Sequence, residues 1–195
     1  YNRTVHVPHL AADITPVTNK AFDDFIQATN YSPEVPYNFL RHWKDNKVPA
    51  GKENHPVVWV DISDARAYCQ WAGKRLPTEE EWQFIAQGYE GHVYPWGKEM
   101  NELNCNANGK DTTEVSAFPN GKSPFGCLDM CGNTWELTES EYSDDHNRFC
   151  LLKGGSYYKA SGFIWYTQGG PQPSTNSIKM LLLYPGLDRS ATIGF

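Results

Sequence analysis

The chain has 195 residues, of which 39% are hydrophobic and 14% aromatic, a composition that excludes a disordered segment and fits one folded domain. A net charge of −6 without any run of lysine or arginine excludes nucleic acid and anionic membrane as partners. No apolar stretch approaches the roughly 18 residues that a membrane helix needs. We therefore expect a single domain over residues 1–195, trimmed from a longer chain.

The chain is predicted to begin with a strand and a helix. The strand is expected at residues 4–10. Thr18 or Asn19 then caps a helix whose apolar stripe ends near residue 30. The following residues, 31–54, are polar and broken by prolines, which predicts a long surface loop.

A short strand at residues 56–60 is expected to precede two further helices. Ser63 caps the first of them, and Gly73 ends it. Thr78 and Glu81 form a capping box for the second, which stops at Gly88. Beyond this glycine, clusters of Gly, Pro, Asn and Asp separate short apolar pieces, which predicts loops and short strands. Two capped helices followed by loop-rich short β-strands indicate an α+β domain.

The cysteines and histidines give two further expectations. Five cysteines favour a secreted, periplasmic or ER-type oxidising compartment, and their odd number leaves one without a partner inside this chain. The six histidines are scattered, and the closely spaced pair His6 and His9 lies in a segment broken by Pro8. Surface histidines are therefore expected there instead of metal ligands.

Four stretches, in this order, resemble the sulfatase-modifying-factor family, to which the formylglycine-generating enzyme belongs. They are Pro16-Val17-Thr18-Asn19, the run from His55 through Trp71-Ala72-Gly73-Lys74-Arg75-Leu76-Pro77-Thr78 to Trp82, Tyr94-Pro95-Trp96-Gly97, and Phe125 to Glu136. Gly154-Gly155-Ser156-Tyr157 and Ile193-Gly194-Phe195 complete the order. The resemblance covers nearly the whole chain and implies a C-type-lectin-like fold with a ligand surface built from loops.

The resemblance also implies where the family's chemistry would lie. In the family's oxidase, two cysteines shortly after the Gly-Gly-Ser turn bind copper and convert a sulfatase cysteine to formylglycine; soft thiolates suit Cu(I). By register, these positions fall at Lys159 and Ile164 here, and no cysteine lies between Leu151 and Phe195. We therefore expect no copper and no catalytic residue. The histidine triad of the family's iron-dependent branch has no counterpart in the scattered histidines.

A calcium site is implied in the loop from Asp129 to Glu136. Hard oxygen ligands within one tight loop are what Ca²⁺ needs. Carried over from the family, Asp129 and Glu136 supply side-chain oxygens, whereas Gly132 and Thr134 supply carbonyls. The alternative is that the two acids merely cap turns.

Two more features follow from the resemblance. A second calcium site is expected near Asn104, although Asp111 is the only acid close by and its spacing departs from the family pattern.

Family members bridge the cysteine at the Cys69 position to one just past the closing Gly-Phe. Four cysteines remain, and they can pair with one another in three ways: they are Cys105, Cys127, Cys131 and Cys150.

The predicted ligand face lies beside the Gly-Gly-Ser turn, where the family places its substrate. Its aromatic rings suit stacking on sugar rings or gripping a peptide, although aromatic residues also fill cores, where we expect Trp135. The face consists of Ser156, Tyr157, Tyr158, Lys159, Phe163, Trp165 and Tyr166, with Arg189 as a contact for an anionic group.

Three functions remain open at this point. The first is a non-catalytic module that binds a peptide or carbohydrate, or a neighbouring domain of a secreted hydrolase or sulfatase. The second is an enzyme. It is either a formylglycine-generating oxidase whose copper-binding positions differ from Lys159 and Ile164, or a relative with other chemistry. The third is a receptor domain diversified by a retroelement, since such receptors share this fold and vary their C-terminal loops. An experiment distinguishes the enzyme from the other two functions: only the enzyme would bind copper and turn over a sulfatase peptide.

Overall fold

The computed structural model describes residues 4–107, 109–159, 169–182 and 188–195. The α-helices lie in the first half of the chain: α1 (Asn19–Thr29), α2 (Ile62–Trp71) and α3 (Glu79–Gln87). Two short 3-10 helices, η1 (Glu102–Asn104) and η2 (Pro119–Gly121), come next. The strands follow as β1 (Trp135–Ser143), β2 (Arg148–Lys153), β3 (Ile178–Leu181) and β4 (Ile193–Gly194). The predicted α+β class is confirmed.

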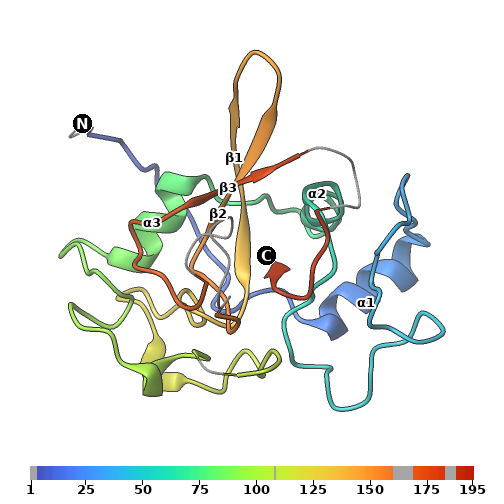
Figure 1. The fold of residues 1–195 in the computed structure, drawn as a ribbon, viewed down its shortest axis with the longest axis horizontal. Coiled ribbons are helices and arrows are strands. Elements are labelled where there is room, and N and C mark those ends of the chain that lie inside the picture. The colour runs from blue at the N-terminus through green and yellow to red at the C-terminus, as the bar shows by residue number, and fades with distance from the viewer. Residues whose placement is uncertain (1–3, 108, 160–168, 183–187) are drawn as a thin grey trace.

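The sheet is built around one long hairpin. Its strand order is β3-β2-β1-β4, with β1 antiparallel to β2 and parallel to β4. In Figure 1 the hairpin stands upright at the centre, with α3 on one side and α1 and α2 on the other. The register of β1 against β2 shifts between Leu137 and Glu141, which is the mark of a β-bulge.

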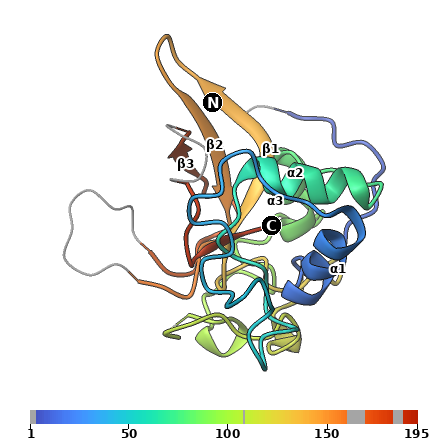
Figure 2. The ribbon, with the colours of Figure 1, turned by 90° about the vertical axis from the view of Figure 1, so that its right-hand side faces the viewer.

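The first and last parts of the domain meet at three backbone segments. The amide of Val17 donates to the carbonyl of Phe195 at 2.8 Å, and the amide of Val57 donates to that of Val17 at 2.8 Å. A Cβ at Gly194 would lie 2.4 Å from the Val57 carbonyl oxygen, so only glycine allows this approach. Residues far apart in sequence therefore lie side by side next to α1 and α2 (Figure 2).

Two apolar clusters form the core. The smaller one gathers around Trp82 on α3, with Ile85, Ala86, Cys127 and Met130. The larger one joins α1 and α2 to β1, β2 and the C-terminus, and includes the buried Trp135 that the sequence led us to expect. Among the described helices, none is long and apolar enough to cross a membrane.

The helix starts agree with the sequence in two cases out of three. The Thr18 hydroxyl accepts from the amide of Ala21, and Thr78 and Glu81 form the expected capping box. Ser63 does not cap α2. Asp61 does, because its carboxylate accepts from the amides of Ser63 and Asp64 at 2.8 and 3.0 Å.

The two early strands that we expected are absent. Residues 4–10 form no strand, and residues 56–60 contribute a single bridge from Pro56 to Thr18. Trp59 has a φ of 61°, in the left-handed region, which interrupts the extended conformation that the apolar run predicted. The loop over residues 31–54 is confirmed as free of helix and strand.

The turn between α2 and α3 is fixed by one arginine. The Arg75 guanidinium donates to both carboxylate oxygens of Glu81 at 2.7 Å and to the Leu76 carbonyl at 3.0 Å. Bidentate pairs of this kind hold planar groups in one orientation. Arg75 therefore fixes the turn to the start of α3, whereas α2 and α3 contribute to different apolar clusters of the core.

Candidate functional site

The Gly-Gly-Ser turn is clamped between two other loops. Gly154 and Gly155 have φ angles of 82° and 83°, and a Cβ at Gly155 would lie 2.2 Å from the Gly170 carbonyl oxygen. The amide of Ser156 donates to that carbonyl at 3.2 Å, and the amide of Tyr157 donates to the carbonyl of Asn133 at 3.0 Å. Both glycines are required, because the backbone conformation and the close approach exclude a side chain.

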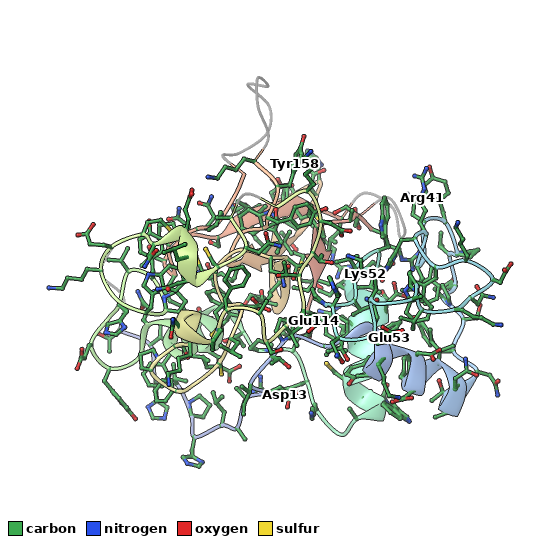
Figure 3. All side chains as sticks on the ribbon, turned by 90° about the horizontal axis from the view of Figure 1, so that it is seen from below. Asp13, Arg41, Lys52, Glu53, Glu114 and Tyr158 are labelled. Carbon is green, nitrogen blue, oxygen red and sulfur yellow. The ribbon has the colours of Figure 1, made fainter. Side chains whose placement is uncertain are left out.

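This clamp buries part of the predicted ligand face. Ser156 is 2% exposed and Tyr157 is 7% exposed, whereas Tyr158 is 56% exposed. The Ser156 hydroxyl accepts from the amide of Tyr158 at 3.3 Å, so it shapes the turn. Figure 3 shows Tyr158 at the edge of the molecule, pointing outward. Of these three side chains, only Tyr158 offers its ring to a ligand.

Lys159 is the residue that the resemblance assigns to the position of the family's first copper-binding cysteine. Its ammonium pairs with a carboxylate oxygen of Glu102 at 2.9 Å, and both side chains are about half exposed. Its aliphatic stem passes over Gly170, where a Cβ would lie 2.9 Å from the Lys159 Cγ. A cation held in this way cannot act as a soft ligand for copper. Phe163, Ile164, Trp165 and Tyr166 lie outside the described residues.

Residues 93–102 border the same face, although no sequence pattern predicted a ligand role for them. The Val93 carbonyl accepts from the amide of Ser174 at 2.7 Å, and Glu102 supplies the partner of Lys159. Between these two contacts, the rings of Tyr94 and Trp96 stack at 5.7 Å with an interplanar angle of 11°. The Tyr94-Pro95-Trp96-Gly97 motif signals the family, but only the tertiary contacts bring it next to Lys159.

Arg189 lies in a different environment from the one that we expected. It is 3% exposed, and its guanidinium is 2.8 Å from carboxylate oxygens of both Asp61 and Asp64. It also donates to the carbonyls of Val35 and Tyr37. The structure thus places Arg189 at the start of α2 as a buried structural cation, with no exposed group to offer a ligand.

Asp129 begins the predicted calcium loop and is almost fully buried. Its carboxylate accepts from the side-chain amide of Asn133 at 3.2 Å. Burial raises the pKa of Asp129 to about 7, and the hydrogen bond from Asn133 only partly offsets this rise. Asn133 in turn bonds to the backbone of Thr113 and to the side chain of Asn106, so a network of amides fixes the loop.

Glu136 ends the loop beside α3. Its carboxylate accepts from the indole nitrogen of Trp82 at 2.6 Å. Burial, together with the nearby charge of Asp129, raises the pKa of Glu136 to about 8, although the hydrogen bond from Trp82 opposes this rise. The Thr134 hydroxyl between them is buried without a hydrogen-bond partner.

The acids of the two expected calcium sites differ in their partners. Over the part of the chain that the structure describes, neither Asp129 nor Glu136 forms an ion pair with a basic side chain, and no group of three His, Cys, Asp or Glu residues gathers as a metal site. Lys153 lies opposite Glu136 in the β1–β2 register, with its buried ammonium over the ring of Trp82. Asp111, by contrast, pairs with Lys52 at 2.8 Å, so the site near Asn104 lacks an uncommitted carboxylate.

A cavity of about 740 Å³ lies on another side of the molecule. Its lining comes from the 9–17 segment and the α2–α3 turn, together with Cys69, Cys127, Glu136 and Phe195. Lys74 and Asp13 form an ion pair at 2.7 Å within this lining. Figure 3 shows Asp13 far from Tyr158. The cavity is therefore separate from the ligand face, and no sequence motif predicted it.

Comparison with known proteins gives one consistent family. Residues 2–180 match the sulfatase-modifying factor enzyme 1-like domain. The chain is 36% identical over 204 residues to the inactive C-alpha-formylglycine-generating enzyme 2 of Bos taurus, covering 80% of this chain and 67% of that protein. It is 36% identical over 151 residues to the serine/threonine-protein kinase Pkn1 of Chlamydia trachomatis, covering 72% and 24%. With the formylglycine-generating enzyme of Thermomonospora curvata it shares 32% identity over 195 residues, covering 73% and 63%.

The chain thus spans about two thirds or less of the length of each of these relatives. Among solved structures, CarF superposes with a TM-score of 0.66 at 19% identity, covering 93% of this chain and 83% of that chain. This likeness, together with the early helices and curled sheet, identifies the fold as C-type-lectin-like. The chain belongs to the sulfatase-modifying factor family.

Proposed function

We propose that this chain is a non-catalytic member of the family that binds a peptide or carbohydrate on the face around Tyr158. The observation that carries the proposal is the ion pair between Lys159 and Glu102. The resemblance assigns the position of Lys159 to the first copper ligand of the family's oxidase. Copper oxidation of a cysteine requires thiolate ligands, and a paired ammonium cannot replace them. Similarity to a relative named inactive supports the same conclusion.

The neighbourhood of Tyr158 has the physical properties of a binding surface. Its ring is exposed on a turn whose backbone is fixed by Gly154 and Gly155, so ordering it against a ligand costs little conformational entropy. The charged pair Lys159 and Glu102 offers hydrogen-bonding groups next to the ring. A flat ring beside a few polar groups is suited to a sugar or an extended peptide.

Calcium binding in the loop from Asp129 to Glu136 is part of the proposal. Asp129 and Glu136 would hold the ion through carboxylate oxygens, and Gly132 and Thr134 through backbone carbonyls. The bound ion would supply the positive charge that the two buried acids lack. This role is structural, since it would stabilise the loop beneath the Gly-Gly-Ser turn.

The partner and the compartment are also proposals. A neighbouring domain of the same polypeptide is a second candidate occupant of the Tyr158 face, and the similarity to 24% of a kinase supports a modular use of such a domain. Attachment to a secreted hydrolase or sulfatase is one such arrangement. Five cysteines support an oxidising compartment.

The binding role is tested by glycan and peptide arrays probed with wild-type protein, Tyr158→Ala and Tyr37→Ala. Tyr37 is 59% exposed and Tyr158 is 56% exposed, so the two substitutions remove similar surfaces. We expect Tyr158→Ala to weaken binding of an array hit several-fold and Tyr37→Ala to leave it unchanged. Equal binding by all three proteins would place the ligand elsewhere.

The absence of oxidase activity is tested separately. A peptide carrying a sulfatase-type cysteine is incubated with the protein, Cu(I), oxygen and a thiol reductant, and aldehyde formation is followed by mass spectrometry. We expect no aldehyde above the protein-free control. Copper-dependent aldehyde formation would show that the chain is an enzyme.

A further inference from the structure

Two loop segments with no helix or strand pairing run side by side beneath the ligand face. The amide of Asn133 donates to the carbonyl of Asn106 at 3.1 Å, and the Asn106 side chain donates to that of Asn133 at 3.2 Å. A Cβ at Gly132 would lie 2.7 Å from the Asn106 carbonyl oxygen. Cys105 directly precedes Asn106, and Cys131 directly precedes Gly132, so the backbone contact brings the two cysteines together.

The side chains of these two cysteines are in contact. Both are free thiols in the structure. Each affects the other's proton affinity: the neighbouring Cys131 lowers the pKa of Cys105, and the neighbouring Cys105 raises the pKa of Cys131. Cys105 is 2% exposed and Cys131 is 1% exposed, and the Cys131 sulfur also lies 3.5 Å from the Gln172 carbonyl oxygen. The pair is therefore enclosed by residues 105–106, 131–133 and 172.

We propose that Cys105 and Cys131 form a disulfide bond when the protein folds in an oxidising compartment. In the first step, one cysteine thiolate attacks a glutathione disulfide, forms a mixed disulfide and releases one glutathione thiol. The second cysteine thiolate then attacks the mixed disulfide, so the Cys105–Cys131 bond forms and a second glutathione thiol leaves. Two protein thiols are oxidised, one glutathione disulfide is reduced to two thiols, and the protons pass to glutathione.

The other cysteines lie in different surroundings. The Cys127 sulfur donates to the carbonyl of Asp13 at 3.4 Å, and the Cys150 sulfur donates to that of Thr138 at 3.5 Å. Cys127 belongs to the cluster around Trp82, whereas Cys150 and Cys69 belong to the larger core cluster. Among the three pairings left open by the sequence, the structure thus favours only the one that contains Cys105–Cys131, and it gives Cys127 and Cys150 no reason to pair.

The bond would connect two parts of the candidate site. Cys105 follows η1, which carries the Lys159 partner Glu102, and Cys131 lies inside the loop from Asp129 to Glu136. The described residues between α3 and β1 contain no α-helix or strand, so side-chain contacts and turns hold this region. A disulfide restricts such a region mainly by limiting the freedom of the unfolded chain. The bond would therefore stabilise the ligand face and the loop together.

The test is peptide mapping. The protein is refolded in a mixture of oxidised and reduced glutathione, quenched with acid, and then digested with trypsin without a reducing agent. Trypsin separates the peptide Glu99–Lys110, which contains Cys105, from the peptide Ser123–Arg148, which contains Cys127 and Cys131. We expect these two peptides to remain joined and to separate when dithiothreitol is added. The Cys127→Ser variant should keep the joined pair, and Cys131→Ser should lose it.

Alkylation and melting provide a second readout on the wild-type protein. In native protein, dithiothreitol should reduce the bond slowly because both sulfurs are buried, and guanidinium should accelerate the reduction. The reduced protein should melt at a lower temperature than the oxidised protein. Free thiols at Cys105 and Cys131 after refolding, or a bond from Cys105 to Cys127, would overturn the proposal; neither result bears on the lack of oxidase activity.

Discussion

The helical region and the loop region each contain a pair of carboxyl groups that are shielded from solvent, and the two pairs differ in their partners. At the start of α2, Asp61 and Asp64 are buried, and the equally buried Arg189 forms an ion pair with each of them. Burial raises the pKa of Asp64, and Arg189 partly offsets this rise. In the loop beneath the Gly-Gly-Ser turn, Asp129 and Glu136 have no basic partner among the described residues, and burial raises both pKa values. The helical region carries its own countercharge. The loop region has no such ion pair among the described residues, so we expect its stability to depend on bound protons or on a cation.

The largest expected effect comes from removing the internal countercharge. Arg189→Met should lower the free energy of unfolding by about 3–5 kcal/mol, because two buried carboxylates lose their partner. Chemical denaturation measures this loss. As a control, Arg148→Ala removes an exposed ion pair with Glu141 and should cost at most about 1 kcal/mol. Equal costs for the two variants would remove the distinction between the regions.

The second expected effect comes from supplying the missing cation. Calcium at 100 times its dissociation constant should raise the stability by about 2.7 kcal/mol. Asp129→Asn and Glu136→Gln should each abolish the response, and Asn suits the φ of 59° at position 129. Asp111→Asn should retain it, since Asp111 already pairs with Lys52. The measurement is the melting temperature of each protein with calcium and with EDTA. An equal melting temperature of wild-type protein under both conditions would contradict the proposed site.

A somewhat smaller effect is expected from pH in the absence of metal. The folded-state pKa values of Asp129 and Glu136, about 7 and about 8, lie above those of the unfolded chain, so the folded state holds protons that the unfolded state has released. The stability contributed by these acids therefore falls as the pH rises from about 4 to about 8.

His42, whose pKa burial lowers to about 4, acts in the opposite direction below pH 6.5. The measurement is therefore the difference between the stability curves of wild-type protein and Asp129→Asn in EDTA. The difference should shrink when calcium is added. A difference independent of pH would show that Asp129 is ionised throughout.

The smallest effect concerns a local cap in the helical region. Thr78→Ala should cost about 1 kcal/mol, because the amide of Glu81 loses the hydroxyl that caps α3. Lys20→Ala, which removes an exposed pair with Asp24, should cost less than about 0.5 kcal/mol. Urea denaturation of both variants compares them, and a cost near zero for Thr78→Ala would mean that tertiary packing alone holds α3.

The sequence by itself predicted the features that depend on neighbours within a few residues. Thr18 and Thr78 cap their helices, and the glycines after Lys153 turn the chain, because each involves groups close together along the backbone. The order of motifs also identified the family and the fold. Capping and turn geometry are local, so they are readable without knowledge of the rest of the chain.

The tertiary structure decided which side chains are available. Ser156 and Tyr157 looked like ligand contacts, but the loops at Asn133 and Gly170 bury them, and Asp61 replaced Ser63 as the cap of α2. The contact between Cys105 and Cys131 likewise exists only because two distant loops meet. Burial and countercharge depend on contacts between segments far apart in sequence, and no local pattern records which segments will meet.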